Sequence, residues 1–265
     1  MPELPSGFSF RRMELADVSS ALQIIGDHDE DDYEWAQATY EKSLDGQYVL
    51  TDRNQLIGVT GAKLVPNTDR TYTISWHYLQ RSYIGQGNGG LLLESLLDVL
   101  RGQNARKVFV HTSDYLDPEE GDVYLNARQA YRSAGFTEEL RHHNFYDENE
   151  TLITLGLRLE LHRSDEPALP NEQKIRWTDI DAIDECEGAY WLAWELDDEG
   201  TEVSGFQTIF DHVRQWNGRV IFAVFPSDVV AARDFMTRGN FRADGMLKDY
   251  YEDGVDEIHF RYDLI

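Results

Sequence analysis

Glycine is concentrated between residues 85 and 90, directly after a segment that is typical of a β-strand. The sequence there is Gly85-Gln-Gly-Asn-Gly-Gly90, so four of six consecutive residues lack a Cβ. Backbone made bare in this way lets another group approach it closely. Five leucines follow at helical spacing, and they are Leu91, Leu92, Leu96, Leu97 and Leu100. The turn therefore ends at a helix N-terminus, whose unpaired N–H groups and positive dipole end suit an anion such as a phosphate. The alternative is a tight connection beneath a buried helix.

The elements around this turn predict a mixed α/β fold. Tyr72–Leu79, just before the turn, alternates apolar and polar residues and reads as a strand. Upstream, the same patterns predict a strand at Phe8–Met13, helices at Asp17–Ile25 and Tyr33–Leu44, and a hairpin of Tyr48–Thr51 with Leu56–Thr60. Downstream they predict a strand at Lys107–Thr112, a helix at Val123–Ala134 and an antiparallel pair at Asn144–Tyr146 and Thr151–Leu159. The predicted order is β-α-α-β-β-β-α-β-α-β-β.

A dinucleotide-binding fingerprint is formally present as Gly85-x-Gly87-x-x-Gly90, with Asp114 near the position of a ribose-binding acid. In that motif the first glycine follows the first buried strand directly. Here Gln80–Ile84 intervenes, and three strands come earlier in the chain. An NAD(P)-dependent oxidoreductase therefore remains the less favoured alternative.

The amino-acid composition excludes some classes of binding partner. The net charge of −25 would repel nucleic acid, so no nucleic-acid partner is expected. No apolar run reaches the length of a membrane span, so no membrane partner is expected either. Cys186 is the only cysteine, which leaves no intrachain disulfide and favours a cytoplasmic protein. No metal site is predicted, and the chain can be a monomer or a homodimer.

The element order and the glycine turn together resemble the GNAT superfamily of acyl-CoA N-acyltransferases. That family places an Arg/Gln-x-x-Gly-x-Gly/Ala turn between a strand and a helix, where backbone amides wrap the CoA pyrophosphate. Ala130-Tyr131-Arg-Ser-Ala-Gly135-Phe136 is similar to the family's Tyr-x-x-x-Gly-Phe helix end. The chain departs from the pattern at Ile84, where the family has Arg or Gln, and at Tyr124, where it often has Asn. The resemblance covers roughly residues 8–160.

The resemblance implies an N-acyltransferase, most simply an acetyltransferase, with acetyl-CoA as co-substrate and a primary amine of a small molecule or peptide as acceptor. It implies a list of cofactor-binding residues: Leu79, Ile84, Gly85, Gln86, Gly87, Asn88, Gly89 and Gly90. Leu79 is included because strands that splay apart leave backbone groups for the pantetheine arm.

An amine with a pKa near 10.4 needs about 4–5 kcal/mol for deprotonation at pH 7, so a base and a donor to the departing thiolate would help. The resemblance gives Tyr131 the donor role; the alternative is a packing tyrosine. His77 is the candidate base because it titrates in the right range, although a lone strand histidine can be structural and His111 is a poorer substitute. Catalysis by positioning alone also stays open.

The acidic stretch His28–Asp32, read as a loop, falls where GNAT proteins shape the acceptor site. It would attract a cationic amine, or it is only a solvated face. A non-catalytic acetyl-CoA-binding sensor or interaction protein is the competing function.

The C-terminal part repeats the first. Tyr131–Leu159 aligns with Met236–Leu264 at a constant offset of 105, which matches Phe136 with Phe241 and Leu159 with Leu264. We expect a GNAT-like domain at 1–162, a linker at 163–173 and a shorter, degenerate GNAT-like unit at 174–265. The counterpart of the glycine turn would be Asp198–Val203, whose acidic residues would repel a pyrophosphate.

Overall fold

The computed structural model describes residues 2–119, 121–162, 164, 168–184, 186–200 and 205–264. The chain forms two compact units that interleave along the sequence. The first contains Met1–Val110, Leu125–Thr137 and Leu155–Leu161, and the second contains His111–Tyr124, Glu138–Thr154 and His162–Ile265. The domain boundaries expected from the sequence remain predictions. Most of the expected linker's acidic residues, and residues 201–203 of the expected counterpart turn, lie outside the described residues.

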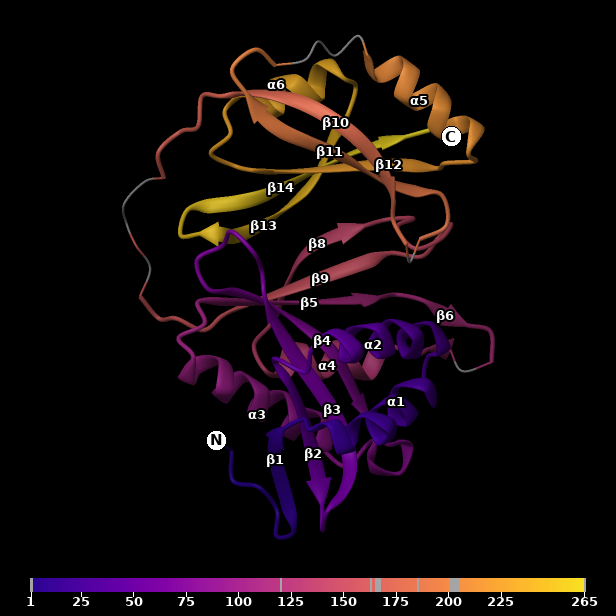
Figure 1. Cartoon of the computed structure of the whole chain (residues 1–265), viewed down its shortest axis with the longest axis vertical. Helices are drawn as coiled ribbons and strands as arrows, with labels where there is room; N and C mark the ends of the chain where they lie inside the picture. Colours follow the sequence, from indigo (N-terminus) through magenta and orange to yellow (C-terminus); the bar gives the residue numbers. More distant parts are fainter. Residues whose placement is uncertain are drawn as a thin grey trace. The chain divides into compact units, whose positions relative to one another are not determined.

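The N-terminal elements follow the predicted order up to α4 (Figure 1). They are β1 (Phe8–Arg12), α1 (Val18–Gly26), α2 (Glu30–Lys42), β2 (Gln47–Asp52), β3 (Gln55–Leu64), β4 (Thr71–Leu79), α3 (Asn88–Gly102), β5 (Lys107–Ser113), α4 (Leu125–Ser133), β8 (Thr137–His142) and β9 (Leu152–Arg158). Short elements also occur: the 3₁₀ helices η1 (Leu15–Asp17) and η2 (Arg81–Tyr83), and the small pair β6 (Leu116–Asp117) and β7 (Gly121–Asp122). The seven longer strands form one sheet in the order β1-β2-β3-β4-β5-β9-β8.

Two sequence predictions about this region are wrong. The stretch His28–Asp32 is not a free loop, because Asp29 is the N-cap of α2 and its carboxylate accepts from the Asp32 N–H. Acidic side chains in a first helical turn are favoured by the helix dipole, which explains why the helix starts there. The strand expected at Asn144–Tyr146 is instead β8, and Asn144–Tyr146 lies in the connection to β9. β8 was missed because Thr137–His142 has few apolar residues.

Helices cover β4 from two sides. Trp76 and Tyr78 pack on the apolar cluster of α1 and α2. The Leu79 side chain lies on the side of α3, where it would meet a Cβ placed on Gly58 or Gly89. Side chains that alternate along a strand point to opposite faces, so β4 presents Tyr78 to one face and Leu79 to the other.

β4 carries an irregularity next to the site. The pairing of β3 with β4 shifts between Val59–Tyr78 and Gly61–Ser75, so β4 has an extra residue there. Trp76 absorbs it with a positive φ of 44°. The result is a β-bulge, which bends a strand and re-aims its side chains. β4 also pairs with its parallel neighbour β5 only from Thr71 to Thr73, so the rest of β4 has an open edge on that side.

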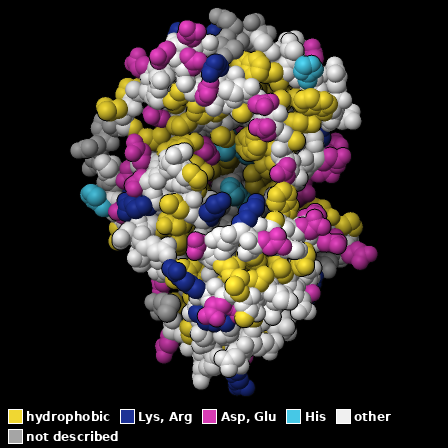
Figure 2. All heavy atoms as spheres, in the orientation of Figure 1, with side chains coloured by type: hydrophobic (Ala, Val, Ile, Leu, Met, Phe, Trp, Pro, Cys, Tyr) yellow, Lys and Arg dark blue, Asp and Glu magenta, His cyan; other side chains and the backbone are white. Residues whose placement is uncertain are grey.

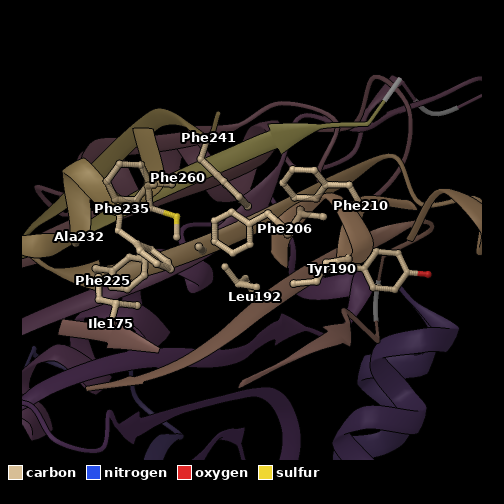
Figure 3. Packing of buried hydrophobic residues seen from close by; sticks show 14 of the residues in the cluster. Ile175, Tyr190, Leu192, Phe206, Phe210, Phe225, Ala232, Phe235, Phe241 and Phe260 are labelled. Carbon is tan, nitrogen blue, oxygen red and sulfur yellow. The ribbon is translucent and has the colours of Figure 1, made fainter. Parts of the chain in front are cut away.

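The second unit has its own sheet and core. Its elements include β10 (Lys174–Ala182), β11 (Ala189–Asp197), α5 (Phe206–Gln215), β12 (Val220–Pro226), α6 (Ala231–Arg238), β13 (Arg242–Glu252) and β14 (Val255–Asp263), with sheet order β10-β11-β12-β14-β13. Figure 3 shows how its aromatic side chains point toward one another from helices and strands. Phe206, for example, packs edge-to-face on Phe235 and Phe241 at centroid distances of 5.3 and 5.6 Å.

The second sheet has the same strand order as part of the first. β10-β11-β12-β14-β13 corresponds to β3-β4-β5-β9-β8. In both sheets the first pair is antiparallel and the second is parallel. α5 and α6 fall between the same strands as α3 and α4. Among the described helices, none combines the length and hydropathy that a membrane crossing needs.

Candidate functional site

The glycine turn has the backbone conformation that its composition suggested. Gly85 and Gly87 have φ of 77° and 83°, in the left-handed region that glycine adopts without strain. Asn88 opens α3, and its side-chain amide donates to the Tyr83 carbonyl at 3.0 Å, which ties the turn to the preceding 3₁₀ helix. Gln86 makes a similar bond to the Ser82 carbonyl at 2.8 Å. These bonds hold the main chain of the turn in place.

The N–H groups of this turn have no acceptor among the residues that the structure describes. Within the part of the chain that the structure describes, the first backbone N–H after Ile84 to donate is that of Leu91, which bonds to Gly87 at 3.1 Å. The N–H groups of residues 85–90 are therefore open donors. They stand at the N-terminus of a 15-residue helix, whose dipole adds positive potential there. Open N–H donors at a helix N-terminus are suited to an anion.

Gly89 and Gly90 lack side chains for a reason other than backbone conformation. Both lie inside α3 without a positive φ, so their conformation does not require glycine. A Cβ on Gly90 would meet nothing within 4 Å, and one on Gly89 would meet only Leu79 Cδ1 at 3.7 Å. Glycine inside a helix costs roughly 1 kcal/mol relative to alanine. Here neither strain nor crowding demands glycine, and the space over this end of the helix is open.

Leu79 lies on the open edge of β4. Its neighbour Gln80 donates to the Ile57 carbonyl at 2.8 Å, and Leu79 is paired with Gly58, so the N–H and C=O of Leu79 face away from β3. The carbonyl oxygen already has a partner, since it lies 2.7 Å from His28 Nε2. Only the N–H of Leu79 is then left for an incoming group on this edge.

His77 has both ring nitrogens engaged. Nε2 lies 3.3 Å from the Gly89 carbonyl, which can only accept, so Nε2 carries the proton and donates. Nδ1 then accepts from the Thr60 hydroxyl at 3.1 Å. Burial lowers the pKa of His77 to about 4, and the bond to Gly89 offsets only part of that effect. The ring is therefore neutral at pH 7, and it connects β4 to the first turn of α3.

Tyr131 is brought next to His77, with ring centroids 5.8 Å apart. It is buried near the end of α4, where Phe136 N–H bonds back to the Tyr131 carbonyl at 3.1 Å and Gly135 has a φ of 96°. Phe136 also packs edge-on against the tyrosine ring at 5.7 Å. Among the described residues, no hydrogen-bond partner lies at its hydroxyl. Burial raises the pKa of Tyr131 well above its usual value, so the hydroxyl keeps its proton and can donate.

Comparison with known proteins decides the family of this region. The model of the acetyltransferase (GNAT) family matches residues 13–136, a range that contains β4, the glycine turn and Tyr131. Residues 13–136 form a GNAT acetyltransferase domain. A search of curated proteins found no match.

Solved structures share the fold of the GNAT domain. An acetyltransferase of the GNAT family from Desulfovibrio desulfuricans has 21% identity and a TM-score of 0.52, over 58% of this chain and 99% of its own. An aminoglycoside 6'-N-acetyltransferase complexed with coenzyme A has 12% identity and a TM-score of 0.50, over 59% and 99%. YncA from Salmonella typhimurium, solved with acetyl-CoA, has 16% identity and a TM-score of 0.47, over 62% and 100%. At these identities the likeness is one of fold.

The GNAT domain also contains a half-buried acid, Asp32, that the sequence analysis treats only as part of an acidic stretch. The Tyr78 hydroxyl donates a short hydrogen bond to the Asp32 carboxylate. Burial raises the pKa of Asp32, and the bond from Tyr78 opposes this shift while the nearby Asp29 and Asp31 add to it. The His28 ring lies beside Tyr78 at a centroid distance of 5.4 Å. Asp32, Tyr78 and His28 therefore form a cluster at the open end of β4.

The structure thus gathers most of the predicted residues in one place. Leu79, residues 84–90, His77 and Tyr131 are linked by the contacts described above. His111 is not among them, because it belongs to the second unit and its Nδ1 lies 2.9 Å from Thr154 Oγ1. Ile84, in place of the family's Arg or Gln, is 43% exposed and supplies no polar group. Among the described residues, no group of three or more His, Cys, Asp or Glu side chains is arranged to hold a metal.

Proposed function

We propose that this protein is an N-acetyltransferase that moves an acetyl group from acetyl-CoA to a primary amine of a small molecule or peptide. The observation that carries the proposal is the row of open N–H donors at residues 85–90, under unobstructed space at the start of α3. The GNAT family match supports it. So does the fold shared with an acetyltransferase that was solved with coenzyme A.

In this proposal the diphosphate of acetyl-CoA binds to the amides of Gly85, Gln86, Gly87, Asn88, Gly89 and Gly90, with Ile84 beside them. The pantetheine arm follows the open edge of β4 and bonds to the Leu79 N–H. The acceptor amine attacks the thioester carbonyl carbon, the C–S bond breaks, and CoA leaves as a thiolate that then takes a proton from water. The amine loses a proton in the same sequence of steps.

Tyr131 is the proposed donor to the departing thiolate. A thiol has a pKa near 8.5, well below that of this tyrosine, so the hydroxyl would stabilise the thiolate by a hydrogen bond rather than give up its proton outright. Tyr131→Phe should lower kcat by about 10- to 100-fold, the worth of a hydrogen bond to a charged group, with the Kd for acetyl-CoA unchanged. CoA release measured with a panel of amines tests this and the function together.

The same assay distinguishes the transferase from the competing functions. Turnover with any amine, reduced in Tyr131→Phe, supports the enzyme. Tight CoA binding without turnover on any amine would favour the non-catalytic sensor. Binding of NAD(P) in preference to acetyl-CoA, measured by thermal shift, would favour the oxidoreductase.

For the general base, the geometry favours Asp32 over His77. Both nitrogens of His77 are occupied, so its ring has no free lone pair to take a proton from an amine. His77 fits the role of a positioning residue that holds the Gly89 carbonyl, and so aims the N–H groups of the turn. The Asp32 carboxylate is held by Tyr78 at the open end of β4, and burial raises its pKa above the usual aspartate value.

The acceptor is proposed to be cationic before it reacts. The first turn of α2 carries Glu30, Asp31 and Asp32, preceded by the N-cap Asp29. This acidic turn adjoins the cluster of Asp32, Tyr78 and His28. A protonated amine would be drawn to these carboxylates and would then have to lose a proton, for which Asp32 is placed. The cytoplasmic location and the oligomeric state remain predictions.

We also propose that residues 174–265 are a degenerate GNAT-like copy that binds no CoA. Its sheet pairs β11 with β12 only from Ala189 to Trp191, as β4 pairs with β5. Trp194 fills the gap beyond: its indole N–H donates to the Val224 carbonyl at 2.7 Å, and its ring stacks on Phe225 at 4.4 Å. A pantetheine arm would find that edge occupied.

If Trp194 closes the edge of β11, each chain has a single CoA site. Calorimetric titration of the full chain with acetyl-CoA should reach saturation at one molecule per chain. A stoichiometry of two would show that the second copy also binds the cofactor, and would remove the proposal that it is degenerate without affecting the GNAT domain.

A further inference from the structure

A recess of about 270 Å³ lies within the second unit. It is bounded by the connection between β8 and β9, the start of β12, and the facing ends of β13 and β14. Its lining residues, all of which belong to the second unit, are His143, Asn144, Glu148, Arg219, Val220, Arg242, Arg261 and Asp263. Three of them are arginines, in a chain whose 49 acidic residues outnumber 24 basic ones. Acidic side chains are spread widely over the face drawn in Figure 2. A convergence of arginines in such a protein needs a physical reason.

Two of the arginines face each other. Arg242 on β13 is the direct cross-strand partner of Arg261 on β14. Like charges in this position destabilise a sheet unless something compensates them. Asp263 is shared between them, with Oδ2 2.9 Å from Arg242 Nη2 and Oδ1 3.0 Å from Arg261 Nε. Arg261 is buried and also lies 3.8 Å from Asp244, a carboxylate already bonded to His142.

The third arginine is held rigidly without any carboxylate. Arg219 donates from Nε to the Glu187 carbonyl at 2.7 Å, from Nη1 to the Asn144 carbonyl at 2.9 Å, and from Nη2 to the Tyr146 carbonyl at 3.4 Å. Carbonyl oxygens fix the orientation of a guanidinium but do not neutralise it. Among the described residues, no acidic side chain forms an ion pair with Arg219. Two of its five N–H donors are left over.

Of the charged groups that line the recess, three are arginines and two, Asp263 and the exposed Glu148, are acids. Asp263 and Asp244 offset Arg242 and Arg261, so among the described residues the guanidinium that no carboxylate pairs is that of Arg219. The guanidinium of Arg219 is fixed in advance, so little conformational entropy is lost when a ligand binds. Unpaired N–H donors on planar forks are suited to the paired oxygens of a carboxylate or a phosphate.

From these observations we infer that the recess binds a small oxyanion, either a carboxylate or a phosphate ester. Its volume lies just below the range of about 300–1,000 Å³ that is usual for small-molecule pockets, which favours a ligand of few heavy atoms. None of its lining residues belongs to residues 13–136, which the GNAT model matches. The inference therefore holds or fails independently of acetyl transfer.

The first test is anion binding by the full chain. Calorimetry with inorganic phosphate, with succinate and with neutral glycerol, at one ionic strength balanced with sodium chloride, should show saturable binding of an oxyanion and none of glycerol. Saturation by phosphate alone identifies a phosphate ester as the ligand class, and saturation by succinate alone identifies a carboxylate. Because the chain has a charge of −25, non-specific anion binding is disfavoured, and absence of binding by either probe overturns the inference.

Arg242→Gln locates the binding. Its side chain is 63% exposed, and its one ion pair among the described residues is with Asp263, so the change should leave the fold intact. Loss of one charged donor should weaken oxyanion binding about tenfold or more. The matched control is Arg238→Gln on α6, which is 53% exposed, pairs with Asp234 at 2.9 Å and does not line the recess. Equal losses in the two variants would mean that only net charge matters, and would overturn the inference.

A second variant, Asp263→Asn, should strengthen oxyanion binding. It removes the carboxylate that competes with the ligand for Arg242 and Arg261, so the Kd for the oxyanion should fall about tenfold. Weaker binding in a folded Asp263→Asn protein would contradict the proposed site. If Asp263→Asn does not fold, the comparison of Arg242→Gln with Arg238→Gln still tests whether the oxyanion binds in the recess.

Discussion

Gly90→Glu should abolish CoA binding while leaving the protein as stable as before, or more stable. Gly90 lies in the first turn of α3 without a positive φ, and a Cβ there would meet nothing within 4 Å. Glutamate is a better helix former than glycine, and an acid near a helix N-terminus is favoured by the dipole. Its carboxylate would nevertheless stand where the diphosphate must bind. Juxtaposed like charges cost several kcal/mol, so the Kd for acetyl-CoA should rise by more than about 100-fold. Calorimetry and thermal unfolding measure the two effects.

Gly102→Glu is the matched control, because Gly102 is the last residue of the same helix and is also unobstructed. The same change of charge and size at the far end should leave CoA affinity unchanged. Its stability should fall slightly relative to Gly90→Glu, since an acid at a helix C-terminus opposes the dipole. Unaltered CoA binding in Gly90→Glu, or an equal loss in both variants, would remove the glycine turn from the site and the transferase proposal with it.

Much of the GNAT domain's fold could be predicted because its elements have strong local signals. The alternation in Tyr72–Leu79, the leucines after Gly90 and the glycine at residue 135 each mark an element that tertiary contacts then reinforce. The repeat at an offset of 105 likewise falls on matching elements, since β8, β9 and α4 shifted by that amount coincide with β13, β14 and α6 within a few residues. Whether the repeat reflects a duplicated GNAT unit remains a proposal.

Features that depend on residues distant in sequence could not be predicted. Nothing in the residue type of Trp76 announces a positive φ, which arises because β3 and β4 pair out of step around it. The start of α2 did carry a signal, an Asp N-cap followed by acidic residues, but the charge run was read as a solvated loop. A run of acidic residues is compatible with a solvated loop and with the first turn of a helix, and only the packing of α2 against β4 distinguishes the two.

The candidate site likewise contains features that the sequence predicts and features that depend on distant residues. The glycine turn at the start of α3 was predictable because bare backbone at a helix start is a local property. The state of His77 was not, since its partners Thr60 and Gly89 come from other elements and together they occupy the lone pair that a base would need. Asp32 gained its special environment from Tyr78, 46 residues later in the chain. Its sequence neighbours give no hint of that contact.

Asp32→Asn should reduce kcat by about 10²- to 10⁴-fold, the usual contribution of a general base. An amide cannot take the proton that the acceptor amine must lose. It can still accept the hydrogen bond from Tyr78, so the local packing should persist. The Kd for acetyl-CoA should not change, because Asp32 lies on the α1 and α2 side of β4, whereas the glycine turn opens α3. Steady-state kinetics with a responsive amine, together with calorimetry, provide the measurement.

The sign of the pH dependence follows from the raised pKa of Asp32. The base acts only when ionised, so kcat/KM of the wild type should be lost as pH falls through a pKa above the ordinary aspartate range. Asp32→Asn should lack this acid limb. For stability the sign is reversed: because the folded state holds the proton more tightly than the unfolded one, ionised Asp32 costs stability at neutral pH and not at low pH. Asp32→Asn should therefore unfold at an equal or higher temperature at pH 7, with the difference shrinking in acid.

Two further variants assign the effect to proton transfer rather than to charge. Asp31→Asn removes the same charge from an exposed neighbour in the same helical turn, and should change KM for a cationic amine with little change in kcat. His77→Gln should weaken CoA binding, through the Gly89 carbonyl, while keeping the acid limb of the pH profile. If Asp32→Asn retains most of its kcat, or if Asp31→Asn loses as much, Asp32 is not the base. The neutral amine would then have to be selected from solution, and positioning alone would account for catalysis.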